Sequence, residues 1–364
     1  MDNPLISAQP QPLAQDFLWN AENVFADATP LYDTLARRIA YDNEILALAA
    51  HAQPHQPAVN LLFSSVHYLL LRGTSTALGI EPDDPLRNFY ADLTRKPNTR
   101  DDPFPIFRAF CEKHAAEIIA LVRTRRVQTN EVARCALFLP AFMLLAQRVQ
   151  EFAMIEVGSS AGLNLNWDRY AYNYGDAVWY GDVASRVKLQ CAARGGIRPP
   201  LKTEMPRVVS RTGIDLNPND VFDDDAMLWL RALVWPEQIE RAERLQNAIA
   251  IARAFPPRVA QGDALELTPR VISEITQATS NATPIVLFHS FVLNQVPQEL
   301  RARYYELLAE QSAGRVLFDL AIEPSAWPAP LILTTFENGA RAQKTLAACD
   351  HHGRWLEWHN DTFL

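Results

Sequence analysis

The hydrophobic pattern of this 364-residue chain changes once, near residue 150, and that change constrains the fold more than any other feature. Before it, apolar residues recur at three- and four-residue spacing, which is the period of amphipathic helices. After it, short apolar runs alternate with helical segments, as in parallel sheets that are covered by helices. The sequence therefore predicts an α/β protein with an all-helical cap domain over residues 1–128 and a sheet domain over 129–364.

The N-terminal part shows helical periodicity almost throughout. The predicted helices cover residues 13–25, 31–51, 59–71, 85–94, 105–127 and 130–150. Proline-containing segments separate several of them, because proline lacks an N–H group and restricts the residue before it. These breaks are expected at 53–57, 79–85 and 96–105.

The C-terminal part contains apolar runs of strand length. The predicted parallel strands are 152–157, 207–214, 258–261, 284–288 and 315–320, with helices at 223–254, kinked at Pro236, and at 297–311. Antiparallel strands are predicted at 331–336, 342–346 and 355–358, with Asn338-Gly339 and His352-Gly353 at the turns. We expect a doubly wound, mostly parallel sheet that binds its ligand at the carboxyl ends of the strands.

About 50 residues separate the first two predicted strands, which is more than a crossover needs. We interpret residues 170–206 as an insertion. It contains a predicted strand at 187–192 and four aromatic residues, Tyr172, Tyr174, Trp179 and Tyr180. The insertion is expected to form a hairpin flap over the ligand site and to give the substrate an apolar or aromatic wall.

Acidic residues outnumber basic ones by 42 to 34, which gives a net charge of −8. Such a field repels phosphate backbones and anionic membrane surfaces, so neither nucleic acid nor a membrane is expected as a partner. The four dispersed cysteines indicate a reduced compartment. Cys349, His351 and His352 lack a second ligand pair at metal spacing, so no metal site is expected.

The N-terminus has neither the basic nor the apolar segment of a signal peptide. The longest apolar run, residues 135–146, is shorter than the roughly 18 residues that a membrane span needs. The sequence therefore predicts a cytoplasmic protein.

The segment from Met154 to Asn164 reads as a buried strand, a turn of small residues and a helix. Such a turn leaves N–H groups and the positive end of the helix dipole facing a carboxylate or phosphate. Gly158 and Gly162 allow a ligand to approach the backbone closely, and Asn164 is near enough to bond to it. Taken alone, the segment is also compatible with a structural strand-to-helix turn.

Two further acids follow predicted strands. Asp215 comes after the second strand, and Asp263, in the segment Gly262-Asp263-Ala264, comes after the third. A carboxylate at the second position can accept both hydroxyls of a ribose, and one at the third can accept an exocyclic amine. Either acid can also act simply as a helix N-cap.

In these residues the chain resembles the class I S-adenosylmethionine-dependent methyltransferases, which have E-x-G-x-x-x-G after strand one, an acid after strand two and a polar end to strand four, here 288–290. The resemblance implies a Rossmann-like domain that binds S-adenosylmethionine and methylates a small molecule. It places Glu156, Gly158, Ser159, Ser160 and Gly162 around the methionine part, Asp215 at the ribose, and Asp263 and Ala264 near the adenine. It also implies that His289 and Ser290 border the transfer site, with His289 as the candidate catalytic base.

More narrowly, the chain resembles an uncharacterised bacterial family that is catalogued as a domain of unknown function. This resemblance rests on residues 128–131, 156–165, 213–218 and 230–236 and covers nearly the whole chain. It carries no established reaction. Thr129 is expected to cap the helix before the first strand, and Glu131, in the first turn of that helix, could lean over the cofactor.

Two departures from the methyltransferase pattern leave other interpretations open. Ser160 stands where many members have a glycine, and the insertion precedes Asp215. Residues 158–162 also match G-x-S-x-G, the nucleophile elbow of α/β-hydrolases, so a serine esterase with Ser160, Asp319 and His351 or His352 is an alternative. A non-catalytic nucleoside-binding protein is a further one.

Overall fold

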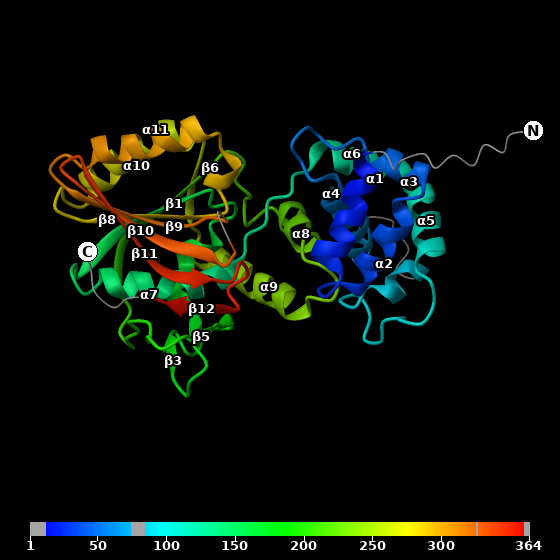
Figure 1. The fold of residues 1–364 in the computed structure, drawn as a ribbon, viewed down its shortest axis with the longest axis horizontal. Coiled ribbons are helices and arrows are strands. Elements are labelled where there is room, and N and C mark those ends of the chain that lie inside the picture. Colours follow the sequence, from blue (N-terminus) through cyan, green and yellow to red (C-terminus); the bar gives the residue numbers. More distant parts are fainter. Residues whose placement is uncertain (1–11, 74–83, 325–326, 360–364) are drawn as a thin grey trace, which may run out of the picture. The chain divides into compact units, whose positions relative to one another are not determined.

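The computed structural model describes residues 12–73, 84–324 and 327–359 (Figure 1). The expected absence of a leader and the expected helix break at 79–85 concern residues that lie wholly or mostly outside these ranges. The chain divides into two compact units. Unit 1 comprises Met1–Thr129 and Asp224–Glu243, and unit 2 comprises Asn130–Asp223 and Arg244–Leu364.

All elements of unit 1 within the described residues are helical. They are α1 (Pro12–Asn20), the π-helical turn η1 (Ala21–Phe25), α2 (Pro30–Ile39), α3 (Asn43–Ala49), α4 (Ala58–Arg72), the 3-10 helix η2 (Pro85–Phe89), α5 (Phe104–Lys113), α6 (Ala115–Thr124), α8 (Asp224–Ala232) and the start of α9 (Ile239–Ala254). The helix expected over 31–51 is split in two, because Asp42 accepts hydrogen bonds from the N–H groups of Glu44 and Ile45 and so begins α3. The helix expected over 105–127 divides at His114.

Helix α4 forms the centre of unit 1. Its residues from Leu61 to Leu70 are all buried, including the polar Ser64, Ser65 and His67, so other elements surround this helix on every side. The ring of Phe63 stacks on Tyr32 of α2 with 4.2 Å between centroids. The core of this unit therefore rests on aromatic contacts around one buried helix.

In the described part of unit 2, nine strands form a sheet in the order β5-β12-β11-β10-β9-β8-β1-β6-β7. The strands are β1 (Glu151–Val157), β5 (Ala192–Arg194), β6 (Arg207–Asp215), β7 (Arg258–Gln261), β8 (Ile285–Ser290), β9 (Val316–Ile322), β10 (Ala329–Glu337), β11 (Ala340–Cys349) and β12 (Trp355–Trp358). The pairs from β7 to β9 and the pair β12/β5 are parallel, whereas β9 to β12 pair in antiparallel fashion. The prediction of a mixed α/β structure with a mostly parallel sheet is confirmed.

The chain changes direction across the sheet at β1. From β1 it runs to β6 and β7 on one side, and β8 then pairs with the other side of β1 and is followed by β9. Because β6, β1 and β8 are parallel neighbours, their carboxyl ends lie at one edge. That edge, on either side of the β1/β8 boundary, is where open α/β sheets bind ligands.

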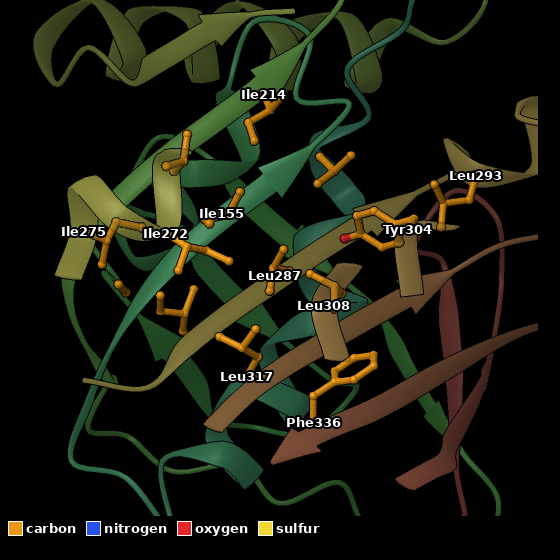
Figure 2. Close-up of a cluster of buried hydrophobic side chains, with 14 residues drawn as sticks. Ile155, Ile214, Ile272, Ile275, Leu287, Leu293, Tyr304, Leu308, Leu317 and Phe336 are labelled. Carbon is orange, nitrogen blue, oxygen red and sulfur yellow. The ribbon is translucent and has the colours of Figure 1, made fainter. Parts of the chain in front are cut away.

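Helices cover both faces of this sheet. Figure 1 shows α10 (Ala264–Ala278) and α11 (Gln298–Gln311) on one face and α7 (Cys135–Leu145) on the other. Figure 2 shows the core under α10 and α11, to which Ile155 and Leu287 contribute from the strands and Ile272 from α10. Successive strand residues point to opposite faces, so Glu156, next to Ile155, points to the α7 face.

The insertion forms a small sheet of its own, with β2 (Ala171–Asn173) between β3 (Trp179–Gly181) and β4 (Lys188–Gln190). The strand predicted at 187–192 is instead split between β4 and β5, which belong to different sheets. Tyr172 and Tyr174 are buried, and their hydroxyls donate to the carbonyl oxygens of Trp167 and Ala136 at 2.6 and 2.7 Å. These two rings are packing residues, contrary to the expected aromatic wall.

Within the described residues, no helix is long and apolar enough to cross a membrane.

Candidate functional site

The turn after β1 is held in an unusual backbone conformation. Gly158 and Gly162 have φ angles of 70° and 69°, and Ser160 has a φ of 53°, which is uncommon for a residue with a side chain. A Cβ atom on Gly158 would lie 2.3 Å from Cγ2 of Val292, so no larger residue fits there. The two glycines of the motif are thus required by the fold of the turn itself.

The prediction of an α-helix after this turn is wrong. Residues Leu163–Arg169 form a 3-10 helix, η4, that is interrupted by non-helical angles at Asn166. The N–H group of Leu163 donates to Oδ1 of Asn130 at 3.1 Å. A short, irregular 3-10 segment does not supply the aligned peptide dipoles of an α-helix, so the α-helix on which the expected anion site depended is absent from residues 163–169.

Asp215 connects the end of β6 to this turn. Its Oδ2 accepts from the backbone N–H of Ser160 at 2.7 Å, and its Oδ1 accepts from the N–H of Asn217 at 2.7 Å. The residue is only 6% exposed. The acid that the resemblance places at a ribose therefore also organises the turn after β1.

Glu156, near the end of β1, is a buried carboxyl group with one oxygen left unpaired. Its Oε1 accepts from Nδ2 of Asn164 at 3.0 Å, while Oε2 has no hydrogen-bond partner within the described residues. Burial raises the pKa of Glu156 well above its usual value, and the Asp215 carboxylate raises it further, against the opposing effects of Asn164 and Arg134. Such a group is costly unless a ligand donates to it.

Arg134 and Cys135, which the sequence analysis did not single out, complete this region. The thiol of Cys135 donates to Oδ1 of Asn164 at 3.4 Å. Arg134 donates from Nη1 to the hydroxyl of Ser290 at 3.3 Å and from Nε to the carbonyl oxygen of His351 at 3.0 Å. The structure thus places Glu156, Asn164 and Ser290 around the start of α7.

The segment before α7 is capped differently from the prediction. Glu131, rather than Thr129, caps the 3-10 turn η3 (Val132–Arg134), because its carboxylate accepts from the N–H of Ala133 at 3.1 Å. Glu131 is 3% exposed and pairs with Arg244 at 3.6 Å and His352 at 3.8 Å. These contacts place the carboxylate of Glu131 in a network of charges.

Asp263 and Ala264 lie at the end of β7. Asp263 is exposed, and its Oδ1 accepts from the N–H of Leu265 at 2.7 Å, so it caps α10. The N–H of Gly262 donates to the carbonyl oxygen of Asp215 at 2.9 Å. The ends of β6 and β7 are therefore joined, and the contact described for the Asp263 side chain is that of a helix cap.

His289 is fully buried between two carboxylates. Its Nδ1 donates to Oε1 of Glu323 at 2.7 Å, and its Nε2 lies 3.5 Å from Oδ2 of Asp319. Although burial lowers the pKa of His289, these two carboxylates raise it to about 10. A pKa of about 10 favours the protonated ring at neutral pH, and this environment disfavours His289 as the base that the sequence predicts.

Ser160, Asp319 and His351, which the alternative serine esterase would use, each contact other residues. The hydroxyl of Ser160 accepts from Nδ2 of Asn219 at 3.1 Å. Asp319 accepts from the hydroxyl of Tyr304 at 3.2 Å, whereas the His351 ring contacts Phe291 and Trp327. Within the described residues there is also no group of three or more His, Cys, Asp or Glu side chains that could hold a metal ion.

Comparison with known proteins gives one match. Residues 14–358 match the family described as "Uncharacterized protein conserved in bacteria (DUF2332)". No curated protein and no solved structure matches the chain. The match confirms the narrower of the two resemblances and covers both units, so this chain belongs to the bacterial family DUF2332.

Proposed function

We propose that this chain is an S-adenosylmethionine-dependent methyltransferase that binds its cofactor at the carboxyl ends of β1, β6 and β7 and methylates a small molecule. The observation that carries the proposal is the buried Oε2 of Glu156, which has no hydrogen-bond partner in the part of the chain that the structure describes. It lies close to the end of β1, next to the boundary with β8 where the chain changes direction across the sheet. Open α/β sheets bind their ligands at this position.

The residues at this edge fit S-adenosylmethionine. The methionine part of the cofactor carries an ammonium group, and a buried carboxylate oxygen without a donor is a suitable partner for it. The ammonium would also favour the ionised form of Glu156, which burial alone disfavours. Asp215, held at the end of β6, offers a carboxylate suited to ribose hydroxyls.

We also propose the finer description of the fold. The parallel order β7-β6-β1-β8-β9 supports a Rossmann-like core in unit 2. The described elements of unit 1, all helical, support an all-helical N-terminal domain.

When bound, the cofactor supplies an electrophilic methyl group. In this proposal the side chains of Glu156 and Asn164 orient the methionine part, with the turn at 158–162 and Ala264 beside the rest of the cofactor. Ser290 and Arg134 border the acceptor. The pair of His289 and Glu323 has a positioning role, since Glu323 accepts from the N–H groups of Val292, Leu293 and Asn294 and so fixes the segment after β8.

Calorimetric titration with S-adenosylmethionine and S-adenosylhomocysteine tests this proposal. Glu156→Gln keeps the shape of the side chain but removes the charge, and the loss of one charge-assisted hydrogen bond should weaken binding by roughly tenfold or more. Glu151→Gln is the matched control, because Glu151 lies at the other end of β1, where it pairs with Arg207 at 3.1 Å and its side chain is 42% exposed. Absence of binding to the folded wild-type protein would overturn the proposal.

A further inference from the structure

Three aromatic rings form a row beside the end of β8. Phe291 directly follows β8, and its ring lies 4.9 Å from the ring of His351, which follows β11. The other neighbour of His351 is Trp327, with 4.6 Å between centroids and an angle of 89° between planes. The His351 ring is thus held between two aromatic side chains from distant parts of unit 2.

Arg134 links this row to the proposed cofactor site. Its guanidinium lies 4.1 Å from the centre of the Phe291 ring. The same group donates to the hydroxyl of Ser290 and to the backbone carbonyl of His351, and its charge acts on Glu156. The row therefore begins at the strand end that borders the proposed methyl-transfer site.

His351 has an unsatisfied ring nitrogen. Its Nε2 is buried and has no hydrogen-bond partner within the described residues. Next to it, the Trp327 side chain is 60% exposed, an unusually large fraction for this residue type. A ring nitrogen without a partner, beside an exposed indole, suits a planar ligand with a hydroxyl group, because a hydroxyl can donate to or accept from that nitrogen.

His351 is also suited to accept a proton at neutral pH. Burial lowers the pKa of His351, and the charges of His352, Arg134 and Arg354 lower it further, against the opposing effect of Asp350. The lowered pKa of His351 favours the neutral ring at neutral pH, whereas the raised pKa of His289 favours its protonated form.

The charges around the row favour an oxygen nucleophile over an amine. Arg134 lies over Phe291, and Arg194 lies over Trp355 at 4.4 Å, with Trp355 6.2 Å from Trp327. An aliphatic amine acceptor is cationic at neutral pH and would be repelled by both guanidinium groups. A phenol is neutral, and its developing negative charge is stabilised by them.

We infer that Phe291, His351 and Trp327 form the acceptor subsite, that the acceptor is a planar phenol, and that His351 is its general base. This inference rests on the proposed function. In the transfer step the phenol oxygen forms a bond to the methyl carbon. The bond between that carbon and the sulfur breaks with its electron pair staying on sulfur, and the phenol proton moves to Nε2 of His351.

Binding of p-cresol, compared with that of its methyl ether 4-methylanisole, tests the subsite without cofactor. Both rings can stack, but only p-cresol can donate to Nε2. Ligand-observed NMR at neutral pH should show that the wild-type protein prefers p-cresol by roughly fivefold, the effect of one hydrogen bond. His351→Phe should abolish this preference, and Trp327→Ala should weaken the binding of both ligands.

His352→Phe is the matched control, because His352 is the adjacent histidine, has a side chain that is 45% exposed and lies outside the ring row. It should retain the preference for p-cresol. Equal binding of the two probes to the wild-type protein, or an unchanged preference in His351→Phe, would overturn the inference. These comparisons use no cofactor, so a failure of the inference about the acceptor subsite can be distinguished from a failure of the proposed function.

Methyl transfer from S-adenosylmethionine to p-cresol tests the role as base. Loss of a general base should lower kcat by about a hundredfold or more in His351→Phe, with a much smaller change in KM. In the wild-type protein kcat should rise with pH through a pKa below 6.5, the ordinary value for histidine. An unchanged kcat in His351→Phe would overturn the assignment of the base even if S-adenosylmethionine binds.

Discussion

The backbone N–H of Ser160 donates to Oδ2 of Asp215 across 2.7 Å, and this bond joins the turn after β1 to the end of β6. Ser160 has a φ of 53°, a conformation that costs energy for a residue with a Cβ atom. A buried, charge-assisted hydrogen bond is strong enough to offset that cost. The geometry of the candidate site therefore depends on a carboxylate from the neighbouring strand.

Asp215→Asn should destabilise the protein by about 1–3 kcal/mol. An amide has one acceptor oxygen where the carboxylate has two, so either Ser160 or Asn217 faces an NH₂ group instead of an acceptor. Urea denaturation measures the change in the free energy of unfolding. Asp220→Asn is the control, because Asp220 makes a similar bond to the N–H of Phe222 in an exposed turn. Equal losses of unfolding free energy in the two variants would contradict the claim that Asp215 holds the turn after β1 in place.

Gly158→Ala should lower the stability of the protein by more than the penalty for placing alanine in a left-handed backbone conformation. Gly175 is the matched comparison, because its φ is 87° and a Cβ atom there would meet nothing within 4 Å. Gly175→Ala should therefore cost only the conformational penalty of about 1–2 kcal/mol, whereas Gly158→Ala adds the clash with Val292. Combining Gly158→Ala with Val292→Ala should recover part of the difference in a double-mutant cycle measured by thermal unfolding. No coupling between the two positions would contradict this account.

The main strands of unit 2 could be predicted because buried parallel strands read as continuous apolar runs. Runs such as 152–157 and 284–288 correspond closely to β1 and β8. The pairing of β1 with β6 and β8 follows from contacts between residues far apart in the chain, which no local pattern specifies. The small residues of the segment 158–162 predict a turn. They do not predict its φ angles or its hydrogen bond to Asp215.

The helix expected after that turn was wrong for a reason that is visible in the sequence. Leu163, Leu165 and Trp167 alternate with polar residues, so their spacing is two rather than three or four. The intervening Asn164, Asn166 and Asp168 have low helix propensity. The segment accordingly forms the irregular 3-10 helix η4.

The partners of the candidate site could not be predicted from local sequence. Arg134 donates a hydrogen bond to the carbonyl oxygen of His351, which lies 217 positions away in the sequence. His289 meets Glu323 across 34 positions, and this carboxylate, together with Asp319, makes it a cation. Whether a histidine is a base depends on such contacts, and its residue type does not decide it.

Glu156→Gln should make the protein more stable at neutral pH while weakening the binding of cofactor. The pKa of Glu156 is raised in the folded state, so the stability that this group contributes is full below its ordinary pKa of 4.5 and is lost as pH rises toward the folded value. Gln does not titrate, so the stabilising effect should be larger at pH 7 than at pH 4. Urea denaturation at both pH values checks this, with Glu151→Gln as the control. A variant that is less stable than the wild type at neutral pH would contradict the cost of burying a carboxyl group with one unpaired oxygen.

His289→Gln should destabilise unit 2 by about 3–5 kcal/mol at neutral pH, because it leaves the buried Asp319 and the partly buried Glu323 without their cation. The pKa of His289 is raised from 6.5 to about 10, so its stabilising contribution is fully present below pH 6.5 and is lost as pH rises through about 10. The wild-type protein should therefore lose stability over this range, and the variant should show a flatter profile. His352→Gln, at an exposed histidine, controls for general effects of the substitution. Urea denaturation from pH 6 to pH 10 measures both profiles, and parallel curves for wild type and His289→Gln would show that the ring is not held as an imidazolium.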